Sequence, residues 1–312
     1  MNTNYLINIA GPTAIGKTSL AIKLANKFDT EIISADSRQF YKEMCIGTAV
    51  PSAEELQAAK HHFIQHISIK DAYNVGDFET EAIQKLEELF QNKKAMVMVG
   101  GSGLYTKSVL HGLDYFPEVP SEIRQDLNQK FEEKGLVPLQ EELQKCDSQY
   151  YKIADIENPQ RVIRALEVSI ASGKPYSSYL NQPKKQRNFI PLSIGLTADR
   201  EIIYERINRR VDLMMKEGLL EEAEKLFLNR HLNALNTVGY KELFSFLEGK
   251  ISLETAIAEI KKNTRRFAKR QLTWFRKDPD IQWFDYKTPV EEIQEFIDTK
   301  IAKSSPPFKG GE

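Results

Sequence analysis

A phosphate-binding loop near the N-terminus constrains the fold of this chain more than any other feature. Residues 11–18 read Gly-Pro-Thr-Ala-Ile-Gly-Lys-Thr, which fits the pattern G-x-x-x-x-G-K-[ST]. An apolar run at 5–10 precedes the loop, and Leu20 and Leu24 follow it at helical spacing. Strand, loop and helix thus occur in the order that gathers backbone N–H groups and the positive end of a helix around anionic oxygens. We expect the loop to bind a phosphorylated ligand.

Two side chains of the loop have expected roles of their own. Lys17 would place a positive charge on the outer phosphate, and the Thr18 hydroxyl is positioned to ligate Mg²⁺. The loop by itself does not identify the ligand.

Further apolar segments predict an α/β fold: a P-loop NTPase-like parallel sheet flanked by helices. Strands expected at 31–35 and 95–99 end in a polar segment, 36–39, and a glycine-rich turn, 100–103. Because ligands bind at the carboxyl ends of parallel strands, these two segments should meet the loop 11–18 in one cleft.

The second half of the chain returns to the sheet after an interruption. We expect strands at 189–196 and 281–284, and no strand between about 115 and 187, where helical patterns alternate with loop residues. The predicted domains are a catalytic core of residues 1–115 and 188–302, a helical insertion at 116–187 and a disordered tail at 303–312.

The overall composition limits the partners and the compartment. The 312 residues carry 43 Lys and Arg against 44 Asp and Glu, so a polyanion has to be recognised by a local patch. The two cysteines, Cys45 and Cys146, form no disulfide framework, and no segment is apolar over membrane-spanning length. These features predict a cytoplasmic protein with no membrane association, and none implies an obligate protein partner.

Asp36 is the first candidate catalytic residue outside the loop. A carboxylate at the end of a strand beside a phosphate site can ligate Mg²⁺ or act as a general base, although it can also cap a turn. Together with Ser37, Arg38 and Gln39 it offers groups that could hydrogen-bond a nucleobase edge.

The strongest charge feature is the segment 261–277, which carries eight basic residues and no acidic one. On a helix, Lys269 and Arg270 fall on a broad basic side that could bind RNA phosphates, while Phe267 and Phe275 can face the core. A solvated helix face is the alternative. For Trp274 in this segment, the sequence favours a core position over base stacking.

Two arginines lie one turn apart on a helix expected to begin near Asp199. Arg206 and Arg210 at this spacing could clamp a diphosphate from the side opposite Lys17, or simply form an exposed helix face.

Taken together, these segments resemble the tRNA dimethylallyltransferases, in the shorter bacterial form. The matching motifs run in family order and lie at 11–18, 36–42, 46–49, 61–63, 100–105, 161–167, 239–242 and 264–276. The resemblance implies transfer of a dimethylallyl group from dimethylallyl diphosphate to N6 of the adenine just 3′ of the anticodon, with Mg²⁺ bound and diphosphate released.

The resemblance also assigns residues to this reaction. Asp36, Lys17 and Arg210 would be catalytic. The diphosphate would contact Gly11, Thr13, Ala14, Ile15, Gly16, Lys17, Thr18, Arg206 and Arg210. The anticodon stem-loop of tRNA would contact Asp36, Ser37, Arg38, Gln39, Ser102, Arg124, Gln160, Arg161, Val162, Ile163 and Arg164, together with Lys269 and Arg270 of the basic segment.

Two other functions share part of this pattern. A P-loop small-molecule kinase would use the same loop and Mg²⁺ with a nucleoside triphosphate, and a non-catalytic RNA-binding ATPase would use the loop and the basic segment. Neither accounts for the ordered set of motifs.

Overall fold

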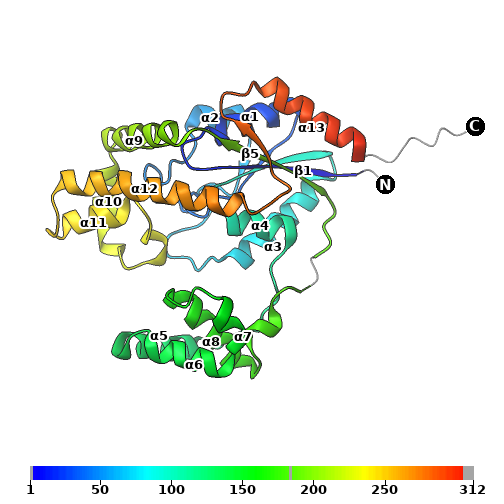
Figure 1. Cartoon of the computed structure of the whole chain (residues 1–312). Helices are drawn as coiled ribbons and strands as arrows, with labels where there is room; N and C mark the ends of the chain where they lie inside the picture. Colours follow the sequence, from blue (N-terminus) through cyan, green and yellow to red (C-terminus); the bar gives the residue numbers. More distant parts are fainter. Residues whose placement is uncertain (1–2, 183–184, 305–312) are drawn as a thin grey trace, which may run out of the picture. The chain divides into compact units, whose positions relative to one another are not determined.

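The computed structural model describes residues 3–182 and 185–304. Within residues 3–111 and 186–304 it contains a six-stranded parallel sheet with helices around it. The strand order is β3-β2-β4-β1-β5-β6. Figure 1 labels the central strand β1 and its neighbour β5. The central strand β1 has all six residues buried, as expected for a strand covered on both faces. The strands are β1 (Tyr5–Ala10), β2 (Ile32–Ser34), β3 (His61–His62), β4 (Ala95–Val99), β5 (Ile190–Thr197) and β6 (Gln282–Asp285).

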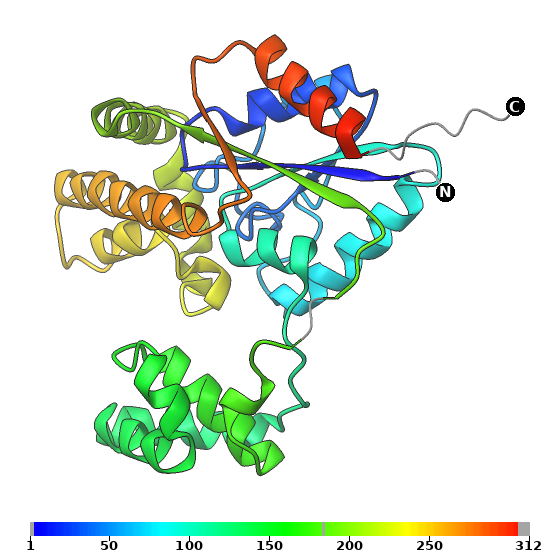
Figure 2. The same cartoon turned by 45° about the vertical axis from the view of Figure 1, so that its right-hand side comes forward.

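Helices cover both faces of the sheet, which confirms the predicted α/β class. Helices α1 (Lys17–Lys27) and α13 (Val290–Ser304) pack on the face that carries Ile7 and Val97. On the other face, α3 (Val75–Leu89) and α4 (Gly103–His111) pack on Leu6 and the neighbouring methionines of β4. Both views place these two helices across the sheet from α1 and α13 (Figures 1 and 2). The short helix α2 (Ala53–Ala58) lies against α1.

A helical layer that no sequence pattern predicts as a unit lies at the carboxyl ends of the strands (Figure 1). It consists of α9 (Arg200–Lys216), α10 (Leu219–Leu226), α11 (Tyr240–Leu247) and the long α12 (Leu253–Phe275), with the 3₁₀ turns η2 (Phe227–Asn229) and η3 (Asn233–Leu235). These helices share a hydrophobic core around Tyr240.

The carboxylate of Glu222 fastens this layer to the segment that follows β2. It accepts hydrogen bonds from the backbone N–H groups of Cys45, Ile46 and Gly47 and from the Tyr240 hydroxyl. A Cβ at Gly47 would lie 2.6 Å from the Tyr240 ring, so this close approach requires glycine. The helical layer therefore holds residues 45–47, in the segment that follows Asp36, in place.

Residues 112–185 form a second compact unit, and residues 1–111 with 186–312 form the first. The described part of the second unit contains α5 (Ser121–Lys134), α6 (Val137–Cys146), α7 (Ser148–Ile153), α8 (Pro159–Ser172) and the 3₁₀ turn η1 (Tyr176–Tyr179), and no strand. Its core gathers side chains from all four α-helices around Leu139 and Leu166.

At the C-terminus, α13 continues through Ser304, two residues into the segment expected to be a tail. The rest of that expectation, for 305–312, lies outside the described residues. Across the described part of the chain, no helix combines the length and apolarity needed to cross a membrane.

Candidate active site

Two glycines with positive φ shape the loop between β1 and α1. Gly11 has a φ of +141°, and a Cβ there would lie 2.6 Å from the carbonyl oxygen of Leu196 in β5. Gly16 has a φ of 110° and directly precedes the first turn of α1. The loop therefore turns tightly against β5 and leads directly into the N-terminus of α1. This is the arrangement that a phosphate cradle requires.

Three cations surround this loop and donate hydrogen bonds to its oxygen atoms. The Lys17 ammonium donates to the Pro12 carbonyl (2.8 Å). From α9, Arg206 donates to the Ala14 carbonyl (2.7 Å) and Arg210 to the Thr13 hydroxyl (3.1 Å). The structure thus brings both arginines to the loop, as a clamp would require, although Arg206 is also exposed on its helix.

Burial weakens the charged forms of two of these cations. Desolvation by burial, partly opposed by the Asp36 carboxylate and assisted by the nearby Arg210, lowers the pKa of Lys17 to about 8. Burial also lowers the pKa of Arg210, again against the attraction of Asp36. An anionic ligand in the loop would favour the charged forms, so the site is electrostatically matched to a polyanion.

Asp36 lies at the end of β2, where the turn after β4 reaches it. The Ser102 hydroxyl accepts a hydrogen bond from the Ser37 N–H, and the two serine hydroxyls are 3.1 Å apart. Oδ1 of Asp36 accepts from the Arg38 N–H, whereas Oδ2 has no hydrogen bond to any described residue. The carboxylate is therefore fixed through one oxygen and presents the other.

The remaining polar groups of the 36–39 segment are mostly engaged within the protein. The Gln39 amide donates to the carbonyls of Thr48 and Ala49, and its oxygen faces the Ser34 hydroxyl. The Arg38 guanidinium donates to the carbonyls of Asn233 and Ala234. Arg38 and Gln39 were expected to hydrogen-bond a nucleobase. In the structure both side chains instead anchor the segment to neighbouring parts of the protein.

The oxygen donors near the loop suit a magnesium ion that is shared with a bound diphosphate. The Thr18 hydroxyl forms no hydrogen bond with a described residue, and Oδ2 of Asp36 is likewise uncommitted. Hydroxyl and carboxylate oxygens are hard ligands, and Mg²⁺ typically takes one or two of them besides substrate phosphates and water. Among the described residues, no group of three or more His, Cys, Asp or Glu side chains could hold a metal ion.

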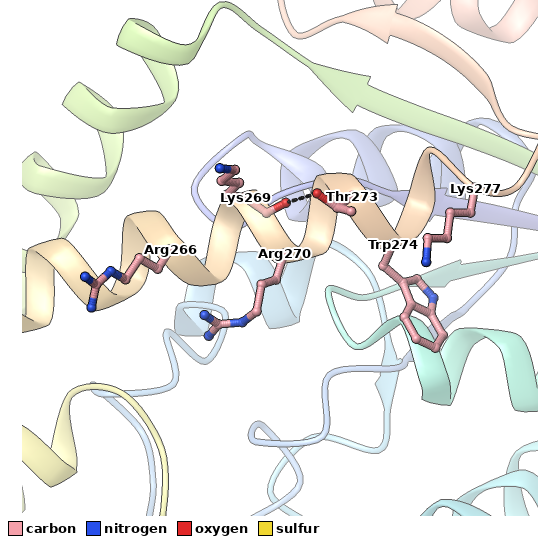
Figure 3. A pocket seen from close by; sticks show the side chains of 6 residues that line it. All are labelled: Arg266, Lys269, Arg270, Thr273, Trp274 and Lys277. Atoms are coloured by element: carbon pink, nitrogen blue, oxygen red, sulfur yellow. Dashed lines mark hydrogen bonds between the residues drawn. The ribbon is translucent and has the colours of Figure 1, made fainter. Parts of the chain in front are cut away.

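One exposed side of α12 forms a basic pocket of about 390 Å³. Figure 3 shows the six residues that line it: Arg266, Lys269, Arg270, Thr273, Trp274 and Lys277. The Trp274 side chain, for which a core position was favoured, is 42% exposed there and lies beside Lys277. We name this surface the basic pocket.

Three further basic residues of this segment are held by contacts within the protein, whereas Arg276 is exposed. Lys261 and Lys262 form ion pairs with Asp212 and Glu259, and Arg265 donates to Asn208. The expectation that Phe267 faces the core is wrong: it is 39% exposed, and the Arg270 guanidinium lies 5.8 Å from its ring centroid. Phe275 is buried as expected.

In the second unit, the expected tRNA contacts on α8 separate onto different sides. Val162 and Ile163 are fully buried in the core of the unit, so their side chains are not available to a ligand. Arg164 donates to the carboxylate of Glu167 (2.6 Å), which is only 1% exposed. Two further expected contacts join this network, since Arg124 donates both to Glu167 and to the Gln160 side chain. Arg161 is exposed.

Comparison with known proteins assigns the chain to a family. The model of the family described as "IPP transferase" matches residues 39–278, which is more than half of the chain. The chain belongs to the IPP transferase family. This IPP transferase is 66% identical to the tRNA dimethylallyltransferase of Christiangramia forsetii, over 96% of this chain and 99% of that protein. It is 58% identical to that of Flavobacterium psychrophilum, over 96% and 99%.

Solved structures of the IPP transferase family share the fold. The full-length tRNA isopentenylpyrophosphate transferase of Bacillus halodurans matches with a TM-score of 0.72 and 36% identity, over 96% of this chain and 98% of that chain. A eukaryotic dimethylallyltransferase acting on tRNA matches with a TM-score of 0.80 and 27% identity, over 99% and 82%.

The lowered pKa of Lys17 predicts how this IPP transferase loses diphosphate affinity with pH. The ammonium is charged below pH 8 and neutral above it, so the dissociation constant for dimethylallyl diphosphate should stay flat up to about pH 7. Above pH 8 it should then rise, by up to about tenfold per unit. Lys17→Met should bind at least about tenfold more weakly at pH 7, because a charge-assisted hydrogen bond contributes about 1.5–3 kcal/mol.

Titration calorimetry between pH 6 and 9.5 measures both effects. The Lys17→Met series controls for ionisation of the ligand, since that variant should lose the rise above pH 8. If wild type and variant show the same pH dependence, Lys17 is not the group that holds the diphosphate.

Proposed function

We infer that this chain transfers a dimethylallyl group from dimethylallyl diphosphate to N6 of the adenine 3′-adjacent to the anticodon of tRNA, and releases diphosphate. The observation that carries this conclusion is the meeting of two chemical subsites at the strand ends. A loop surrounded by Lys17, Arg206 and Arg210 suits a diphosphate, and the Asp36 carboxylate is close enough to raise the pKa values of Lys17 and Arg210. The 66% identity over almost the whole length of a tRNA dimethylallyltransferase supports the same reaction.

On the donor side, the protein's task is to stabilise the leaving group. The allylic carbon gains positive character as its bond to oxygen breaks, and negative charge accumulates on the diphosphate. Lys17 and Arg210 are the enclosed cations next to the loop, and Arg206 approaches it from the same helix. Mg²⁺, held by Thr18 and the diphosphate, would supply further Lewis-acid stabilisation.

On the acceptor side, the adenine must leave its stack before its exocyclic amine can reach the allylic carbon. A base in a loop can be extruded into a protein cleft and read there. We assign Asp36 the role of accepting the N6 proton as the C–N bond forms, through Oδ2, while Oδ1 stays bonded to the Arg38 N–H.

The basic pocket on α12 fits the phosphate backbone of the same RNA. Lys269, Arg270 and Lys277 are exposed and form no ion pair within the described residues, so their charges are available to a polyanion. The exposed indole of Trp274 adds a flat surface on which a base can stack.

The function is tested by offering two labelled donors separately with unmodified tRNA. Dimethylallyl diphosphate labelled in its allyl carbons should transfer its label to the RNA, whereas ATP labelled in the γ-phosphate should transfer none. Transfer from ATP to any acceptor, with none from the allylic donor, would indicate a kinase instead.

Asp36→Asn separates a general base from a metal ligand. The amide keeps the size of the side chain but cannot readily accept a proton, so the single-turnover rate of prenyl transfer should fall by roughly 10²–10⁴, with tRNA affinity changed far less. The measurement uses an anticodon stem-loop across a Mg²⁺ series. Partial recovery at high Mg²⁺ would indicate a ligand role, and a rate above about a tenth of wild type would contradict the base assignment.

The basic pocket predicts a specific salt dependence. Replacing both Lys269 and Arg270 with Gln should weaken tRNA binding and lower the log–log salt slope by up to about two, because two phosphate contacts are lost. Replacing the ion-paired Lys262 with Gln provides the control, with a slope close to wild type. An unchanged slope in the double variant would return this surface to an ordinary solvated helix face.

A further inference from the structure

A buried glutamine on the basic helix is not used by the mechanism described so far. Gln271 on α12 is only 6% exposed, although its neighbour Arg270 and the nearby Thr273 are exposed. Both ends of its amide are hydrogen-bonded. Oε1 accepts from the Thr13 N–H (2.8 Å), and Nε2 donates to the Gly101 carbonyl (2.9 Å).

These two bonds also determine the orientation of the amide. A backbone N–H can only donate and a carbonyl can only accept, so a flipped side chain would lose both bonds. An apolar side chain of similar size could fill the volume, but it would leave the Thr13 N–H and the Gly101 carbonyl without this partner. The contact therefore defines a geometry as well as filling space.

The two backbone groups belong to opposite sides of the site. Thr13 is in the loop after β1, and its hydroxyl accepts from Arg210. Gly101 precedes Ser102, whose hydroxyl binds the N–H of Ser37, next to Asp36. The amide of Gln271 thus joins the diphosphate loop to the turn that supports the acceptor carboxylate.

The hydrogen bonds of the sheet end before they reach Thr13 and Gly101. Along β1 and β4 the register runs to Ile9 opposite Val99, and the Gly100 N–H still reaches the Ile9 carbonyl at 3.4 Å. Beyond that point the two chains diverge into their loops. Gln271 reconnects them at Thr13 and Gly101, past the end of the strands.

Two glycines let α12 approach closely enough for this contact. A Cβ at Gly101 would lie 2.3 Å from Nε2 of Gln271 and 3.9 Å from Oδ2 of Asp36. At Gly103, a Cβ would lie 2.2 Å from the Trp274 indole. Gln271 and Trp274 are three residues apart on one helix, so both press on the same turn.

We propose that Gln271 is a positioning residue. Its amide sets the distance between the diphosphate loop and the turn 100–103, which supports the segment of Asp36. This distance in turn sets the one between the allylic carbon and the attacking amine. The proposal rests on the function inferred above. The rate of a transfer between two bound substrates depends strongly on the distance between the reacting atoms. A misplacement of about 1 Å can lower that rate by about 10²-fold. Binding of either substrate alone does not depend on the spacing.

Two variants test the proposal. Gln271→Met keeps the volume and removes both hydrogen bonds, so the single-turnover rate at saturating substrates should fall about 10–100-fold. The separate dissociation constants for dimethylallyl diphosphate and for the anticodon stem-loop should change less than about threefold, because each subsite remains intact on its own.

Gln271→Glu adds a readout that a purely structural role would not produce. An ionised carboxylate can accept from Thr13 but would face the Gly101 carbonyl with an unfavourable charge, whereas the protonated acid restores the donor. The rate of this variant relative to wild type at the same pH should therefore rise toward one as the pH falls from 8 to 6.

Asn263→Leu is the matched control. Asn263 is also an amide on α12. It donates to Glu242 in the helical layer (2.8 Å) and accepts from Arg266 of the basic pocket (3.4 Å), and it forms no hydrogen bond with Thr13, Gly101 or Asp36. Its loss should lower the melting temperature and leave the single-turnover rate within about twofold of wild type.

The outcomes are distinguishable. If wild type transfers no label, the proposed function is wrong. If wild type is active and Gln271→Met stays within threefold of its rate, or if both dissociation constants worsen as much as the rate, the positioning role is overturned. Should Gln271→Met fail to fold, the pH profile of Gln271→Glu decides, and a ratio that does not change with pH rejects the proposal.

Discussion

Three cations around one short loop impose the constraint that the rest of the structure satisfies. Lys17, Arg206 and Arg210 donate to oxygens of the loop that they surround. Burial imposes a desolvation cost, and repulsion from Arg210 adds to it, which is why the pKa of Lys17 falls to about 8 despite the nearby Asp36 carboxylate. The cost is tolerable only if α1 and α9 are rigidly held. A polyanion offsets it, so the charge arrangement itself selects the class of ligand.

The helical layer supplies much of that rigidity. It positions α9 with its two arginines, and through Glu222 it fixes the chain that follows Asp36. Gln39 reinforces the arrangement by binding the carbonyls of Thr48 and Ala49. The segment 36–39 was expected to supply nucleobase-binding side chains. Part of it instead holds Asp36 in position, with Oδ2 of that carboxylate uncommitted. Fixing the carboxylate in advance avoids reorganisation during the reaction.

The sequence predicts the parts of the site that depend on local order. Short sequence patterns predict the loop, the strand before it and the helix after it. They also predict the strands before Asp36 and Ser102, and the carboxyl ends of parallel strands lie at one edge of the sheet, which brings these two residues together. Arg38 and Gln271 could not be assigned in this way, since their partners lie 195 and 170 residues away or more. Phe267 was misplaced for a related reason: an apolar residue on a helix faces the core only where another element covers it.

The second unit shows how helical geometry divides a continuous motif. Successive residues on α8 are about 100° apart, so 160–164 cannot present one surface. Val162 and Ile163 build the core, and the buried Glu167 draws in the guanidinium groups of Arg124 and Arg164 from the polar side. One carboxylate between two arginines leaves a net positive charge and holds both guanidinium groups in a fixed position, which a flexible arginine pair would not provide. The core residues of the motif thus serve its polar residues, by holding the helix that orients them.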